Sequence, residues 1–431
     1  MIWLWISAAV ILSWLFCRRK VAWYHYIWIL LPIEMYGIQV AGATLKPYML
    51  FGLLLIAKNV FERRTQKVPL AFLAVALMLT ISDILTGFIL ASVMQHLMFL
   101  FVIFIGLNYL SYQSDGIEFE EMGQAALAAT IGYGIVFIIA WLTFQSGLSL
   151  QDVYAYNRFD TGIVLRLTSY GGLVSSRLRG FCIDPNSVIT TLIPGGAYAI
   201  ANIVYRKTDI IKSTIALAVY SIVVVYSGSR MAVICTLAML VLFFFIAYNR
   251  AQNKLRAAAF GLIAIAALLS VFIISADSII LDIATIWNDT FGERATLQSE
   301  YGRFSIWKSN ISYLFQNHKA LFGVGQNQIY LLTTQKRACH NTWLEWICGT
   351  GVFFGTIIDC WFLFALRDFR KRVSKIGSFN AHDGIPVITA YIIVIICIST
   401  VDNITNSVLL FLMLTLRYGV IENDSLQEGA V

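Results

Sequence analysis

Long apolar segments alternate with short polar connectors along almost the whole chain. A helix of roughly 20 mostly apolar residues crosses about 30 Å of hydrocarbon, and segments near this length predict about 12 to 13 membrane-spanning helices. Two neighbouring segments, 21–39 and 47–60, are separated by only a few residues, so either of them could be re-entrant or the two fused. The predicted spans cover residues 2–16, 21–39, 47–60, 68–84, 87–110, 124–145, 186–205, 212–227, 231–248, 258–275, 342–366, 385–400 and 407–421.

The composition supports a membrane protein. The 431 residues are 59% hydrophobic and 13% charged, whereas soluble domains are about 45–50% apolar and about 25% charged. This balance excludes a free cytosolic enzyme, a secreted disulfide scaffold, a disordered chain and a nucleic-acid-binding module, despite the net charge of +7. We therefore predict an all-α, polytopic membrane fold.

Charge in the connectors predicts the orientation. Five connectors rich in Lys and Arg fall on one side if the spans alternate, and basic connectors face the cytoplasm. With an odd number of spans the N-terminus then lies outside. The first segment has no basic residue before it, so we interpret it as a retained span and not a cleavable signal peptide. The five basic connectors begin at Arg18, Lys58, Arg206, Arg250 and Arg367.

Two connectors are too long to be simple turns, and both lie on the exoplasmic side of this topology. They predict a working face outside the membrane. The chain accordingly divides into N-terminal helices, a first long loop, central helices, a second long loop with the candidate site, and C-terminal helices, over residues 1–145, 146–185, 186–275, 276–341 and 342–431.

Arginine is the main basic residue on the predicted outer face, and its planar fork binds phosphate in a bidentate manner. A polyanionic ligand is therefore expected outside, with pairing to outer carboxylates as the alternative for any single arginine. Arg230 is the clearest candidate, because it follows Ser227-Gly228-Ser229 between two apolar runs, where a charge near hydrocarbon is costly. Snorkelling to lipid headgroups is its alternative.

Arg179 is a second candidate. It precedes Pro185-Asn186, which open a predicted span, and a helix N-terminus offers free amides to an anion. A simple turn and helix cap is the alternative interpretation.

The second long loop contains an apolar stripe at helical spacing, which predicts a helix on or near the membrane surface. Gly323 and Gly325 follow it and are a weak signal for a phosphate-binding turn. The stripe consists of Phe304, Trp307, Ile311 and Leu314.

His340 lies where this loop re-enters the membrane. An imidazole, with an ordinary pKa of about 6.5, can accept a proton from a hydroxyl at neutral pH; a structural or solvated histidine is the alternative. Asn341 suits either substrate orientation or capping of the following helix, and capping is favoured. Cys182 and Cys339 lie at the outer side, and a disulfide between them stays open.

Six short motifs follow one another along the second half of the chain: Arg179-Gly180, Pro185-Asn186, Ser227-Gly228-Ser229-Arg230, Gly302-Arg303 with Trp307, His340-Asn341-Thr342-Trp343-Leu344-Glu345, and Gly349-Thr350-Gly351-Val352 with Gly355. In this order they resemble the O-antigen polymerase and O-antigen ligase superfamily. The resemblance covers roughly residues 170–360 by motif and the rest by the pattern of spans.

The resemblance implies a bacterial inner-membrane glycosyltransferase of the GT-C-like, lipid-donor type, with its active site facing the periplasm. It implies a sugar donor on undecaprenyl pyrophosphate and no metal, nucleotide or other cofactor. Arg230 and Arg303 would bind the donor pyrophosphate, and His340 would act on the acceptor hydroxyl, with Asp184, Glu300 or Glu345 as the alternative base. Further substrate-binding residues are expected at Arg177, Arg179, Asn186, Asn341 and Glu345.

Among the functions of this superfamily we predict polymerisation of lipid-linked oligosaccharide repeat units. The alternative is a ligase that transfers the glycan to lipid A core, and a flippase for the lipid-linked oligosaccharide is the rival from another class. The resemblance alone suggests a chain-length regulator as partner, besides membrane lipids. No Walker-type glycine loop is present in the sequence, so no ATP-driven step is expected.

Overall fold

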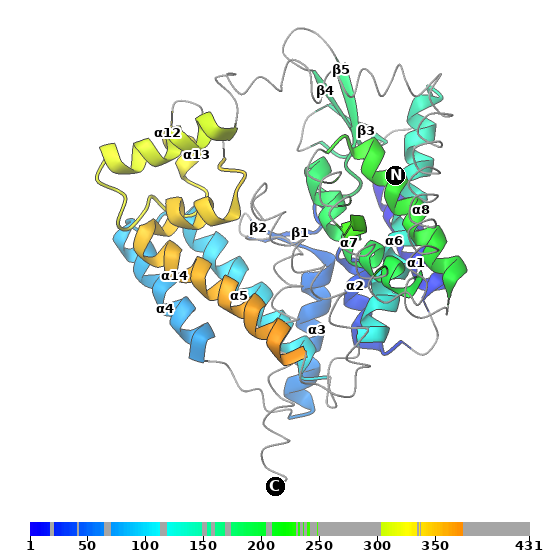
Figure 1. The fold of residues 1–431 in the computed structure, drawn as a ribbon, viewed down its shortest axis with the longest axis horizontal. Coiled ribbons are helices and arrows are strands. Elements are labelled where there is room, and N and C mark those ends of the chain that lie inside the picture. Colours follow the sequence, from blue (N-terminus) through cyan, green and yellow to red (C-terminus); the bar gives the residue numbers. More distant parts are fainter. Residues whose placement is uncertain are drawn as a thin grey trace. The chain divides into compact units, whose positions relative to one another are not determined.

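The structure is a computed structural model of the chain. It is mostly helical in the residues that it describes, with two small β-sheets (Figure 1). It describes residues 1–17, 21–40, 43–63, 70–112, 119–148, 153–156, 160–168, 174–203, 209–229, 303–333, 336 and 338–373, and six further positions between 232 and 248.

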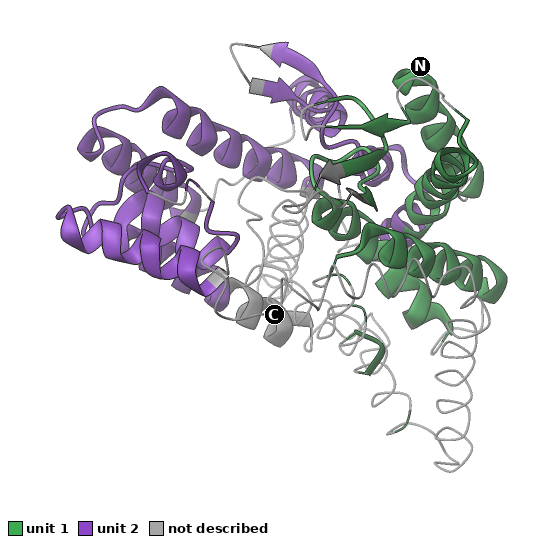
Figure 2. Cartoon of the chain, turned by 90° about the horizontal axis from the view of Figure 1, so that it is seen from above, with its two compact units in different colours: residues 1–16, 127–302, 386–394 green, residues 17–126, 303–385, 395–431 purple. Residues whose placement is uncertain are grey.

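The chain divides into two compact units, coloured separately in Figure 2. Each unit combines segments that are far apart in the sequence. Unit 1 comprises Met1–Phe16, Leu127–Gly302 and Pro386–Val394, and unit 2 comprises Cys17–Ala126, Arg303–Ile385 and Ile395–Val431.

Unit 1 packs helices around a small apolar core of Leu127, Ile131, Ala199 and Ala216. Its three-stranded sheet has the order β3-β4-β5, in which β3 pairs parallel and β5 antiparallel with β4. The described elements are α1 (Ile2–Phe16), most of α6 (Phe119–Gln145), β3 (Tyr154–Ala155), β4 (Val164–Thr168), β5 (Val174–Leu178), α7 (Pro185–Ala201) and α8 (Ile210–Ser227).

Unit 2 packs α4 against both α5 and α14, and α3 against α5. A second core lies between α12, α13 and the start of α14, where Leu314, Val324, Ile329 and Cys348 are buried. The described elements are η1 (Trp23–Tyr26), α2 (Ile27–Leu30), β1 (Ile38–Val40), β2 (Ala43–Leu45), α3 (Pro47–Phe61), α4 (Leu70–Leu85), α5 (Leu90–Leu110), the start of α6, α12 (Arg303–Gln316), α13 (Ile329–Leu332) and α14 (Thr342–Val373).

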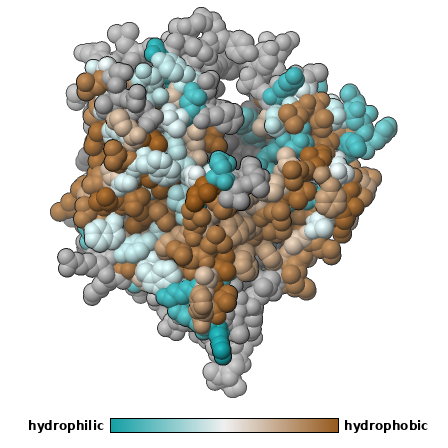
Figure 3. All heavy atoms as spheres, turned by 180° about the vertical axis from the view of Figure 1, so that it is seen from behind, coloured by the Kyte–Doolittle hydropathy of each residue, from teal (hydrophilic) through white to brown (hydrophobic). Residues whose placement is uncertain are grey.

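Several helices have the length and apolar surface of membrane spans, and apolar side chains cover broad parts of the face in Figure 3. Four described segments can cross a membrane by length and composition: Leu90–Tyr109, Glu121–Gln145, Ile210–Ser227 and Thr342–Phe364. Shorter apolar helices occupy Ile2–Phe16, Pro47–Phe61 and Phe72–Leu85. These findings support a membrane protein.

The total of 12 to 13 spans stays a prediction, because several of the expected spans fall where no structure is described. The spans predicted at 258–275, 385–400 and 407–421, and most of 231–248, lie outside the described residues.

The prediction of one helix over residues 21–39 is wrong. The segment forms the short helices η1 and α2. Helix α2 ends at Leu30, and the chain then enters the β1–β2 hairpin. Pro32 accounts for the stop, since proline has no N–H for a helical hydrogen bond. Gly37 allows the tight pairing, because a Cβ there would lie 2.2 Å from the Leu45 carbonyl oxygen.

The fold is also not purely α-helical, since the first long loop contributes the β3–β5 sheet. Strands β4 and β5 place Val164, Leu165 and Leu178 in the interior. Each strand is five residues long, which is too short to stand out against twenty-residue apolar spans.

The amphipathic stretch of the second loop is a helix, α12, as predicted. The stripe is divided in the structure: Leu314 is buried in the unit 2 core, whereas Phe304 and Ile311 are 67% and 40% exposed. An exposed apolar edge of this kind is typical of a helix at a membrane surface, and that location stays a prediction.

Candidate active site

Unit 1 brings three of the predicted motifs together, and we call Arg177, Asn186 and Ser227–Ser229 the arginine cluster. Arg177 lies on β5 and its Nε donates to the Ser227 carbonyl oxygen at 2.8 Å. Gly228 ends α8 with φ +55°, and a Cβ there would lie 3.3 Å from Arg177 Nε. The tight end of α8 is therefore shaped around the guanidinium of Arg177.

Asn186 joins the start of α7 to the same cluster. Its Oδ1 accepts a hydrogen bond of 2.6 Å from Ser229 Oγ, while its backbone N–H donates to Asp184 Oδ1 at 2.9 Å. Asp184 is thus the N-cap of α7, so the helix cap given above as the alternative interpretation of this turn is present. Arg230 follows Ser229 directly in the sequence and lies outside the described residues.

Arg179 has a different environment from Arg177. Its side chain is 0% exposed, and its guanidinium donates to the Gly162 carbonyl oxygen at 3.0 Å and to the carbonyl oxygen of Asp160. These bonds fasten the turn that leads into β4. The predicted role of Arg179 in substrate binding stays a prediction.

Unit 2 brings the other motifs together, and we call Asn310, Cys339, His340, Asn341 and Glu345 the histidine cluster. His340 has φ +47°, a left-handed conformation that is uncommon for residues other than glycine. Strain of this kind persists only where the surroundings hold it, and it is concentrated at functional sites.

The residue before His340 is held on its main chain and on its side chain. Trp307 Nε1 donates to the Cys339 carbonyl oxygen at 2.7 Å, and Asn310 Nδ2 donates to Cys339 Sγ at 3.2 Å. Cys348 Sγ lies 3.8 Å from Cys339 Sγ. This contact, together with burial and the nearby Glu345 carboxylate, raises the pKa of the Cys339 thiol.

Neither Cys182 nor Cys339 is part of a disulfide in the structure, so the pairing left open between them is not formed. Cys182 is a buried residue of unit 1. The sulfur that lies beside Cys339 is that of Cys348, in the second turn of α14.

The residues after His340 begin α14. Asn341 Oδ1 accepts from the Leu344 N–H at 3.0 Å, so Asn341 caps the helix as the sequence favoured. Glu345 lies in the first turn, where a negative charge is stabilised by the helix dipole, and it interacts electrostatically with His340. The Asn341 cap and the dipole of α14 together hold the Glu345 carboxylate near His340.

The Glu345 carboxylate is 1% exposed, its two oxygens are engaged unequally, and the Cys339 thiol and main-chain N–H also lie close to it. Oε1 accepts from the Asn327 N–H at 3.1 Å, whereas Oε2 has no hydrogen-bond partner in the part of the chain that the structure describes. A buried oxygen without a partner is costly. Oε2 therefore has the capacity to accept a further hydrogen bond.

A break in α14 holds the loop that carries Asn327. Gly351 has φ +86° and ψ 165°, so the helix is interrupted there. The freed carbonyl oxygens of Cys348 and Gly349 accept from the N–H groups of Val324 and Gly325, at 3.0 and 2.9 Å. The interruption thus exchanges helical hydrogen bonds for bonds to the loop.

The loop glycines are explained by this packing. A Cβ on Gly323 would lie 2.4 Å from the Gly349 carbonyl oxygen, and one on Gly351 would lie 2.0 Å from that of Leu321. The close approach of backbone to backbone therefore accounts for Gly323 and Gly351, whereas Gly325 is required by its positive φ of +94°. The phosphate-binding turn suggested for Gly323 and Gly325 stays an untested prediction.

Arg303 is the first residue of α12, four positions before Trp307. Its helix is the one that supplies Trp307 and Asn310 to the histidine cluster. The assignment of Arg303 to the donor pyrophosphate stays a prediction.

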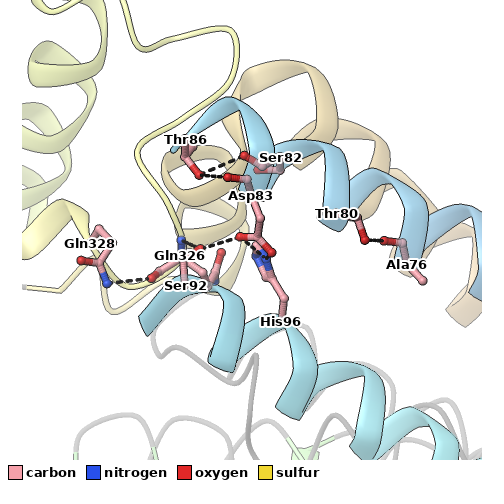
Figure 4. A network of polar contacts seen from close by, with 9 residues as sticks. All are labelled: Ala76, Thr80, Ser82, Asp83, Thr86, Ser92, His96, Gln326 and Gln328. Atoms are coloured by element: carbon pink, nitrogen blue, oxygen red, sulfur yellow. Dashed lines mark hydrogen bonds and ion pairs between the residues drawn. The ribbon is translucent and has the colours of Figure 1, made fainter. Parts of the chain in front are cut away.

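Four polar residues beside the histidine cluster were missed by the sequence motifs: Asp83, Ser92, His96 and Gln326 (Figure 4). All four are buried. An aspartate and a histidine thirteen residues apart, in two neighbouring apolar segments, were the available signal, since ionisable residues inside spans mark functional sites.

Comparison with known families finds one match, which covers part of the chain. Residues 215–358 match the family model described as O-antigen ligase, and the match includes Ser227–Ser229 and the whole histidine cluster. The match supports the O-antigen ligase and polymerase superfamily, whose members are glycosyl-transferring enzymes. No curated protein matches the chain.

Proposed function

We propose that the protein polymerises lipid-linked oligosaccharide repeat units at the periplasmic face of a bacterial inner membrane. The donor is a glycan on undecaprenyl pyrophosphate, and the acceptor is a sugar hydroxyl of the next lipid-linked unit. The single observation that carries this proposal is the strained His340, fixed between Cys339 and the Asn341 cap, with the buried Glu345 carboxylate one turn into α14.

Donor binding is assigned to the arginine cluster, with Arg230 and Arg303. As the bond between the anomeric carbon and the phosphate oxygen breaks, its electron pair passes to the pyrophosphate, which gains negative charge. A fixed guanidinium stabilises that charge as it develops, and one well-placed donor contributes about 3–4 kcal/mol. The bond from Arg177 Nε to the Ser227 carbonyl oxygen supports this role, because it orients the guanidinium at the end of α8.

Acceptor activation is assigned to the histidine cluster. His340 removes the proton from the attacking hydroxyl, whose oxygen forms the new bond to the anomeric carbon on the face opposite the leaving pyrophosphate, with inversion. Glu345 binds the acceptor through Oε2; if Glu345 is itself the base, His340 positions the acceptor.

The test is incubation of the purified protein in detergent with one lipid-linked repeat unit. A ladder of products that differ by one repeat, formed without lipid A core, is expected. Product that forms only when lipid A core is added would instead show a ligase, which the family match does not separate from a polymerase.

A flippase would give no product with either acceptor and would move the lipid-linked unit across a vesicle membrane. A chain-length regulator, if it acts on this protein, would change the length distribution of the ladder and not its presence.

A further inference from the structure

A buried polar network in unit 2 lies behind the histidine cluster. Asp83 lies in the last turn of α4 and His96 in the second turn of α5, and His96 Nδ1 lies 2.9 and 3.0 Å from the two carboxylate oxygens of Asp83 (Figure 4). The two side chains are only 7% and 3% exposed. Such a pair is costly inside an apolar helix pair, so a simple packing role does not explain it.

Ser92 connects this pair to the loop before the active site. Its hydroxyl donates to Asp83 Oδ1 at 3.1 Å and accepts from the Gln326 N–H at 2.9 Å. The next residue, Asn327, donates its own N–H to Glu345 Oε1. A continuous path of hydrogen bonds and one peptide unit therefore runs from Asp83 to the Glu345 carboxylate.

The same network also contacts the start of α14. The ring of His96 stacks on Trp346, the residue after Glu345, with ring centroids 6.4 Å apart and an interplanar angle of 9°. The Gln326 side chain lies against Gly349, where a Cβ would come 2.2 Å from its Oε1. Trp346 and Gly349, in the second turn of α14, therefore both contact residues of the network.

Polar atoms without partners gather at this place. Five buried polar atoms have no hydrogen-bond partner within the described part of the chain: His96 Nε2, both amide atoms of Gln326, Trp346 Nε1 and Glu345 Oε2. Unsatisfied buried groups of this number call for an explanation beyond packing. A polar ligand or water that arrives with the acceptor would supply their hydrogen bonds.

We propose that Asp83, Ser92 and His96 are positioning residues of the active site. They hold the Gln326–Asn327 main chain, so that the Asn327 amide orients Glu345 Oε1 and leaves Oε2 directed to a hydroxyl of the acceptor glycan. This inference rests on the proposed function and adds a means of orienting the acceptor.

The experiment combines kinetics with hydrogen–deuterium exchange on the full chain in detergent. Ser92→Ala removes the link with little change in volume. We expect faster exchange in a peptide that contains Gln326 and Asn327, and kcat for polymer formation about 10- to 100-fold lower, because a small misplacement of a reacting group has that effect. KM for the lipid-linked unit should stay within about twofold.

Two further variants separate positioning from general damage. Asp83→Asn keeps an oxygen that accepts from Ser92 and should retain more activity than Asp83→Ala. Thr80→Ala on the same helix removes only a hydroxyl bonded to the Ala76 carbonyl, and should change neither exchange nor kcat.

The outcomes distinguish the two proposals. An active wild type whose kcat is unaltered by Ser92→Ala would overturn the positioning role and leave the polymerase intact. A wild type that forms no product from either acceptor would overturn the proposed function and the positioning role with it. Faster exchange with a fall in kcat alone, and partial rescue by Asp83→Asn, would support the positioning role.

Discussion

The arginine cluster and the histidine cluster hold their functional groups by different means. Arg177 is half-buried, and its side-chain Nε is oriented by a hydrogen bond to the Ser227 carbonyl oxygen at the end of α8. His340 is instead fixed through a strained backbone whose neighbours, Cys339 and Asn341, are both buried and hydrogen-bonded. Binding of a large anion tolerates some side-chain freedom, whereas proton transfer requires a base at one fixed place.

This difference predicts the largest effect for His340→Ala. Loss of a general base lowers the rate by about 100- to 10,000-fold, measured as polymer formed from one lipid-linked unit. His318 provides the matched control, since it is an exposed histidine of the same loop that also has a positive φ of 56°. Full-length polymer from His340→Ala would remove the role assigned to the imidazole.

The next largest effect is expected on the free energy of unfolding. Gly351→Ala combines a positive φ with a Cβ 2.0 Å from a carbonyl oxygen, and should destabilise the protein by about 3 kcal/mol or more. Gly87→Ala has nearly the same φ, +84°, with nothing within 4 Å, so it isolates backbone strain. Thermal unfolding in detergent measures both, and equal losses would contradict the importance of the close approach.

A smaller effect is expected in the arginine cluster. Arg177→Ala should raise KM for the lipid-linked unit by about 10- to 100-fold, the equivalent of one or two charge-assisted hydrogen bonds, with less change in kcat. Arg166→Ala, an exposed arginine on the neighbouring strand β4, is the control. A fall in kcat with unchanged KM for Arg177→Ala would contradict the assignment of Arg177 to donor binding.

The smallest effect concerns pH. Because the folded protein raises the pKa of Cys339, the unfolded chain loses this proton first, and the free energy of unfolding should fall as pH rises above the ordinary thiol range. Cys339→Ser should flatten this dependence in a series of unfolding curves.

The burial of the Cys339 thiol can also be measured by labelling. Peptide mapping should find Cys339 unlabelled by a maleimide at neutral pH in the folded protein and labelled in sodium dodecyl sulfate.

Helices were predictable wherever a single apolar segment decides the outcome. The predicted spans 2–16 and 47–60 correspond to Ile2–Phe16 and Pro47–Phe61 within one residue. The cap at Asn341 was predictable too, because capping depends on residues within one turn.

Features that depend on distant partners were not predictable. The break in α14 lies within an apolar run, and its stability comes from N–H groups of a loop about 25 residues earlier in the chain. The pairing of Asp83 with His96 likewise requires the turn between α4 and α5 to bring two helices together. Hydrophobic periodicity indicates the length of a helix. It does not indicate which distant atoms replace the backbone hydrogen bonds that are lost where the helix is interrupted.

The interruption at Gly351 also has a consequence for biosynthesis. Its open carbonyl groups cannot enter lipid alone, because hydrocarbon offers them no donor. The segment 319–325 that supplies those donors precedes α14 in the chain and therefore leaves the ribosome first. The order of synthesis thus delivers the partner before the helix that needs it, and a variant with this segment transplanted after α14 would expose the gap to the translocon.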